Sequence, residues 1–169
     1  TLRPPEPEVA ARLDLEAGMQ LLSQEKYAAA LARLERSALV RADDPRVRRA
    51  AGLAAFFASG KLSAGDEKNE LVRRAVGHLS EARKAWRASD GVLVRPFERD
   101  DDFLRDVLMY LGLARASLGD FAEATSTLGE LVVRHPEDAI ARYNFACALA
   151  LSGDGDEAMV QLAEAVKRD

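Results

Sequence analysis

Few side chains in this sequence are of the types that carry out catalysis or bind metal ions. The two histidines, His78 and His135, have no Cys, His or carboxylate partner at the spacing of a metal site. Neither histidine stands where it could complete a Ser-His-Asp set. We therefore expect two solvated histidines, with no metal site, no cofactor and no catalytic residues.

Two further motifs have a structural explanation that is simpler than a chemical one. The run Asp100-Asp101-Asp102 lacks the alternation and the glycine of a calcium-binding loop, and is expected to cap a helix that begins at Phe103. Gly153-Asp154-Gly155 follows no strand and has no Lys-Ser or Lys-Thr pair, so it predicts a turn between helices and not a phosphate-binding loop.

Cys147 is the only cysteine, which excludes an intramolecular disulfide. It has no His or Lys near it along the helix, so nothing lowers the pKa of its thiol, and we expect a small packing residue. These observations together predict a protein that is not an enzyme.

The elements that must hold these residues are helices whose sequence repeats at a fixed step. The step is about 34 residues, which is typical of a helix-turn-helix unit that is stacked on copies of itself. The repeat is visible when Ala114, Gly119, Asp120, Glu123, Ala124, Leu128, Glu130 and Arg134 are compared with Ala148, Gly153, Asp154, Glu157, Ala158, Leu162, Glu164 and Arg168. A content of 31% charged and only 6% aromatic residues agrees with an all-α protein.

Apolar residues at helical spacing, interrupted by Pro and Gly, predict one compact domain of four helical hairpins. Their bounds are roughly 9–44, 45–88, 102–135 and 136–169. The Pro-rich residues 1–8 predict an extended linker. The second hairpin has an enlarged turn near 61–66, and residues 89–101 are predicted to form an inserted, ordered loop on the surface.

One unit of the repeat resembles the tetratricopeptide repeat family, and nearly the whole chain follows its pattern. The residues at the family's spacings are Leu111-Gly112, Ala114, Gly119-Asp120-Phe121, Ala124, Leu128 and Pro136. The resemblance implies an α-solenoid, a right-handed superhelical array of about four α-hairpins. We expect Gly18 and Gly112 where two helices approach closely, and Tyr27, Leu34 and Leu128 in the wider gap between hairpins.

The resemblance also implies a concave groove, which the first helix of each hairpin lines and in which a partner is held. The residues carried over to this lining are Arg12, Leu15, Met19, Leu22, Arg49, Phe56, Met109, Leu113, Tyr143, Asn144 and Cys147. Members of the family that serve chaperones bind an acidic peptide C-terminus with Lys, Arg and Asn. Because this groove is mostly apolar, we do not expect a chaperone tail as the partner.

Two explanations of an apolar groove remain open. A partner helix or extended segment docks in it, or it is filled from within by residues 92–97 or by neighbouring core residues. We expect a non-enzymatic adaptor, scaffold or assembly factor with a protein or peptide partner of unknown identity. The alternative is a homo-oligomer in which the open C-terminal hairpin stacks on the first hairpin of another copy.

Charge and hydropathy make two classes of partner unexpected. A net charge of −4 provides no overall attraction to nucleic acid. No stretch approaches the about 18 uninterrupted apolar residues that membrane insertion needs. The Ala-, Arg- and Leu-rich usage resembles that of bacteria with high-GC genomes.

An arginine-rich region around the first inter-hairpin turn has acidic residues close to it in sequence. We therefore expect a neutralised, solvated face and not a site for an acidic partner. The arginines are Arg41, Arg46, Arg48, Arg49, Arg73 and Arg74, and the acidic residues are Glu35, Asp43, Asp44 and Glu70.

Overall fold

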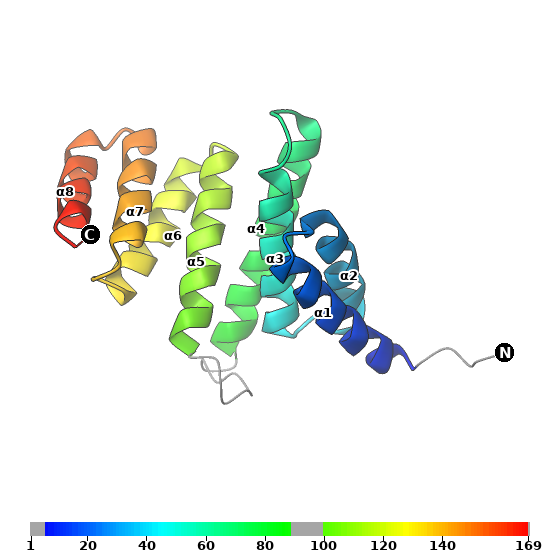
Figure 1. Ribbon diagram of the computed structural model, residues 1–169. Coiled ribbons are helices and arrows are strands. Elements are labelled where there is room, and N and C mark those ends of the chain that lie inside the picture. The colour runs from blue at the N-terminus through cyan, green and yellow to red at the C-terminus, as the bar shows by residue number, and fades with distance from the viewer. Residues whose placement is uncertain (1–5, 89–99, 169) are drawn as a thin grey trace. The chain divides into compact units, whose positions relative to one another are not determined.

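A computed structural model describes residues 6–88 and 100–168, whose eight α-helices form four hairpins (Figure 1). This confirms the predicted all-α fold of about four hairpins. The hairpins are α1 (Pro7–Ser23) with α2 (Tyr27–Val40), α3 (Pro45–Ser59) with α4 (Asp66–Ala88), α5 (Asp100–Ser117) with α6 (Phe121–Arg134), and α7 (Ala139–Ser152) with α8 (Gly155–Val166).

The chain divides into two compact units, whereas its composition predicts a single domain. Unit 1 spans Thr1–Leu93 and contains α1 to α4, and unit 2 spans Val94–Asp169 and contains α5 to α8. In unit 1 the two hairpins pack through α2 and α3, and in unit 2 through α6 and α7. Each pair of hairpins therefore buries its own set of Leu, Val and Ala side chains.

Two helices begin earlier than the sequence predicts. Helix α1 begins at Pro7, inside the predicted linker, because the fixed φ of proline and its missing N–H suit the first turn of a helix. Helix α5 begins at Asp100, so the three aspartates occupy its first turn and do not precede it. Residues 89–99, which make up most of the predicted loop, lie outside the described residues.

In the first and third hairpins, a glycine lies where the two helices approach each other closely. A β-carbon on Gly18 would lie 2.6 Å from Leu34 Cγ, and one on Gly112 would lie 2.5 Å from Leu128 Cγ. Both distances are shorter than two carbon atoms tolerate, so only glycine allows this packing. The close approach is as predicted, but Leu34 and Leu128 fill space inside a hairpin and not the gap between hairpins.

The second hairpin keeps this contact across a longer connection. Gly52 follows Gly18 by one full repeat, and a β-carbon on it would lie 2.5 Å from Leu79 Cγ. Leu79 stands farther along the chain from its glycine than Leu34 does from Gly18. Many of the additional residues belong to α4, which has 23 residues, whereas α2 has 14. The predicted enlarged turn is thus a longer hairpin, whose tip projects past the α1–α2 turn in Figure 1.

Candidate protein-binding site

The predicted groove residues of unit 2 divide into buried and exposed ones. Met109 on α5 is only 5% exposed, and its Sδ accepts a hydrogen bond of 3.2 Å from Asn144 Nδ2 on α7. These two residues therefore join α5 to α7, and Met109 is a packing residue and not part of an open groove. Leu113 is half-buried. Tyr143 and Cys147, one turn apart on α7, are exposed, so Cys147 is not the packing residue that the sequence predicts.

The predicted groove residues of unit 1 offer less apolar surface. On α1, Arg12 and Met19 are exposed, Leu22 is half-buried and Leu15 is buried.

The remaining two, Arg49 and Phe56 on α3, are half-buried. The ring of Phe56 lies 5.9 Å from that of Phe57, which lies 5.2 Å from Tyr27 on α2. Tyr27 thus fills the gap between the first two hairpins, as the sequence predicts, and Phe56 belongs to the same aromatic cluster.

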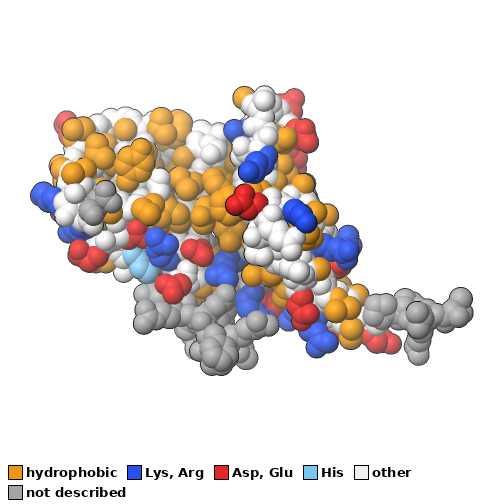
Figure 2. All heavy atoms as spheres, viewed as in Figure 1, with side chains coloured by type: hydrophobic (Ala, Val, Ile, Leu, Met, Phe, Trp, Pro, Cys, Tyr) orange, Lys and Arg blue, Asp and Glu red, His pale blue; other side chains and the backbone are white. Residues whose placement is uncertain are grey.

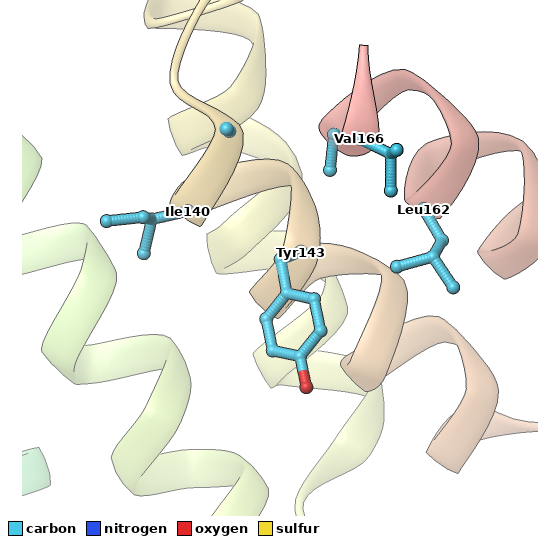
Figure 3. Close-up of a pocket in the computed structure, with 6 residues that line it drawn as sticks. Ile140, Tyr143, Leu162 and Val166 are labelled. Carbon is cyan, nitrogen blue, oxygen red and sulfur yellow. The ribbon is translucent and has the colours of Figure 1, made fainter. Parts of the chain in front are cut away.

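An apolar pocket of about 260 Å³ opens between α7 and α8 in unit 2 (Figure 3). Its six lining residues are Ala139, Ile140, Tyr143, Leu162, Ala165 and Val166. Ile140, Tyr143 and Val166 are 62%, 53% and 71% exposed. On the face of unit 2 shown in Figure 2, hydrophobic side chains gather over α7 and α8. Of this pocket, the sequence assigned only Tyr143 to a binding surface.

The corresponding part of the preceding hairpin is closed. Leu162 and Val166 correspond, one repeat earlier, to Leu128 and Val132 of α6, which are 0% and 7% exposed. Helices α5 and α7 both pack on α6, and Leu128 lies against Gly112 of α5, whereas α7 is the only described helix that packs on α8. The pocket therefore includes residues of α8 whose counterparts in the preceding hairpin are buried. A repeat-by-repeat comparison of the sequence, extended to the last hairpin, could have found it.

Charged residues that are close in sequence to the pocket residues are paired with one another. Lys167 Nζ and Arg168 Nη1 each lie 2.6 Å from a carboxylate oxygen of Glu164, and their hydrogen bonds lower the pKa of Glu164 to about 2. Arg168 Nε also lies 3.2 Å from Glu137 Oε2. These pairs leave the lining itself without charge, so an apolar group is what it can accept.

Four of the six predicted arginines pair with acidic neighbours, as the sequence predicts: Arg41, Arg46, Arg73 and Arg74. Asp44 accepts a hydrogen bond of 2.8 Å from Arg46 and lies 3.0 Å from Arg41. Glu35 on α2 pairs with Arg74 on α4. Since these side chains satisfy one another, they do not form an open site for an acidic partner.

His78 differs from its prediction as a solvated residue. Its side chain on α4 is only 13% exposed, with Nε2 3.4 Å from Glu35 Oε1 on α2 and Nδ1 3.3 Å from Arg48 Nη1 on α3. Burial lowers the pKa of His78 below its ordinary value of 6.5, and the charges of Arg48 and Arg74 act in the same direction, against Glu35. Sequence spacing provided no signal of this, because the three helices meet only in the tertiary structure.

We expect the stability of unit 1 to fall between about pH 7.5 and pH 5.5 because of His78. The unfolded chain takes up a proton near the ordinary pKa of 6.5, whereas folding holds His78 neutral to lower pH, so acid favours unfolding. Urea unfolding at the two pH values measures the difference, and His78→Gln should reduce it. An equal loss of stability in His78→Gln would contradict this role. The carboxylates Asp14 and Glu35, whose pKa values are lowered, act only below this range.

The described residues contain neither a group of three or more His, Cys, Asp or Glu placed to hold a metal ion nor a helix long and apolar enough to cross a membrane.

Comparison with known proteins shows the fold alone. No protein-family model and no curated protein matches the chain. Solved structures do match. MamA from Desulfovibrio magneticus RS-1 is 19% identical with a TM-score of 0.71, over 95% of this chain and 76% of its own. YrrB, described as a TPR protein with an unusual peptide-binding site, is 20% identical with a TM-score of 0.67, over 92% and 67%. The Thermus thermophilus TPR protein TTC0263 is 18% identical with a TM-score of 0.53, over 94% and 91%.

Proposed function

We propose that this chain, which has the α-hairpin fold of tetratricopeptide repeat proteins, is a non-enzymatic protein-interaction module. It binds an apolar segment of a partner protein at the pocket between α7 and α8. The observation that carries the proposal is the exposure of Ile140, Tyr143 and Val166 around this pocket. Apolar side chains that gather at the surface of a soluble protein usually mark an interaction site.

The dimensions and chemistry of the pocket favour a protein segment over a small ligand. Its volume of about 260 Å³ lies below the range of about 300–1,000 Å³ that is typical of small-molecule sites. The lining side chains carry a single polar group, the hydroxyl of Tyr143, which can fix the orientation of one polar atom of the partner. An amphipathic helix that inserts one or two apolar side chains fits these conditions. The peptide-binding site of YrrB supports a role of this kind for the fold.

Replacing Tyr143 with glutamate is expected to weaken such binding at least about tenfold, because a charge would enter the contact and an aromatic anchor would be lost. Helical peptides selected from a display library against the wild-type protein provide the probe, and fluorescence anisotropy provides the affinity. Tyr143→Phe should retain most of it.

Leu39→Glu is the matched control, since Leu39 is 84% exposed on α2 in unit 1 and does not line the pocket. Selected peptides that bind Tyr143→Glu as tightly as the wild type would place the binding surface elsewhere.

A further inference from the structure

Helix α8 has an exposed apolar stripe. The corresponding residues of α6, in the preceding hairpin, are covered. The stripe consists of Met159, Ala163 and Val166. All three are exposed, Met159 at 66% and Val166 at 71%. The counterparts of the last two on α6 are Gly129 and Val132. Val132 is 7% exposed, and a β-carbon on Gly129 would lie 3.4 Å from the ring of Phe145 on α7. Among the described helices, none takes the place on α8 that α7 takes on α6.

The residues of helix α1 can be placed in register with those of α7, which makes this contact. Gly18 holds the place in α1 that Gly112 holds in α5, and Ala146 follows Gly112 by one repeat. In this register Leu13 of α1 corresponds to Ala141 of α7, which is 0% exposed.

Leu13 is 52% exposed. It lies on the opposite side of α1 from Ala11, Leu15 and Gly18, which are buried. The first helix therefore carries an exposed apolar side chain at the position that the buried Ala141 holds in α7.

The polar groups of the two faces also match. Between α5 and α7, Arg105 Nη2 pairs with Asp138 Oδ2 at 2.6 Å. The corresponding residues are Ala139 on α7 and Ala10 on α1, so alanine replaces both members of this ion pair.

The second polar contact between α5 and α7 is a hydrogen bond, and the corresponding residues of α7 and α1 can also form one. Met109 and Asn144, which share a hydrogen bond, correspond to Tyr143 on α7 and Glu16 on α1. The hydroxyl of Tyr143 can donate to the carboxylate of Glu16. Both side chains are exposed, so they can meet in this way.

We propose that α1 of a second copy docks on α7 and α8 as α7 docks on α5 and α6, so that copies of this chain associate head to tail. This rests on the proposed function, since it names the occupant of the same pocket. The two sides of the contact differ, so each association leaves one α1 face and one α8 face free for a further contact of the same kind.

Sedimentation velocity over a wide concentration range tests the proposal with the full chain. The wild type is expected to gain mass as its concentration rises. Leu13→Glu places a charge on the α1 face, and Val166→Glu places one on the α8 face. Each substitution should weaken association at least about tenfold. An equimolar mixture of the two variants should form dimers, because one retains a working α8 face and the other a working α1 face. Leu39→Glu should associate like the wild type.

Three results would overturn the head-to-tail contact. A wild type that stays monomeric at every concentration excludes it. Loss of association in Val166→Glu but not in Leu13→Glu indicates a symmetric pairing of two α8 faces. A mixture that stays monomeric excludes α1 as the occupant. Circular dichroism of each variant confirms that it is folded. If the wild type is monomeric but selected peptides still require Tyr143, the head-to-tail contact fails and the proposed function stands.

Discussion

A glutamate in place of Met109 is expected to lower the free energy of unfolding of unit 2 by at least about 3 kcal/mol. Met109 is 5% exposed, and its sulfur accepts a hydrogen bond from the side-chain amide of Asn144. A carboxylate there would lose most of its hydration and gain one hydrogen bond. The substitution would also remove the apolar contacts of the methionine side chain. Urea unfolding, followed by circular dichroism, measures the loss.

The same substitution at Tyr143 is the matched comparison. Tyr143 is 53% exposed, so a glutamate there keeps its water and should change stability by no more than about 0.5 kcal/mol. Met109→Leu, which nearly conserves volume, should cost less than about 1.5 kcal/mol.

The destabilisation caused by Met109→Glu should also shrink in mild acid. Burial favours the neutral carboxyl group and raises its pKa above that in the unfolded chain, so protonation near pH 5 relieves part of the cost. If Met109→Glu is as stable as the wild type at neutral pH, Met109 is not buried and the predicted open groove regains support.

Replacing Leu79 with alanine is expected to cost unit 1 about 2–5 kcal/mol. The side chain is 0% exposed and fills the space left by Gly52, where the two helices of the second hairpin approach each other closely. Its removal leaves a cavity that neighbouring helices close only in part. Denaturant unfolding measures the total loss, and hydrogen exchange of amides in α3 and α4 locates it.

Lys68→Ala is the control that separates two registers of this hairpin. Lys68 follows Gly52 at the same separation in the sequence at which Leu34 follows Gly18. If the second hairpin followed the regular repeat, position 68 would carry the contact. We expect Lys68→Ala to change stability by less than about 0.5 kcal/mol, because Lys68 is half-buried and its removal leaves no internal cavity. A larger effect at Lys68 than at Leu79 would contradict the register.

The proposed binding site changes what the sequence predicts in one respect. The sequence predicts a groove along the first helices of all hairpins, from Arg12 to Cys147. We propose a more local surface, because Leu15 and Met109 are buried while Ile140 and Val166 are exposed. The expected partner is still an apolar protein segment, and the surface proposed for it lies on the last hairpin.

The sequence by itself determines the helices, their pairing in hairpins and the glycines at the close approach inside a regular hairpin. Helical periodicity, Pro and Gly at helix ends and the fixed repeat step are local signals, and they are present in the order of residues. For the same reason Gly18 and Gly112 could be placed at close contacts, since a residue without a β-carbon signals close approach.

Only the tertiary structure decides which side of each helix remains open. His78 is buried because α2 and α3 bring Glu35 and Arg48 to it from distant parts of the sequence. Met109 is covered because α7 supplies Asn144, and its counterpart Tyr143 is exposed because none of the described helices takes that place on the last hairpin. The repeat specifies similar residues at both positions, but exposure depends on which element packs over them, and that is not a property of the repeat.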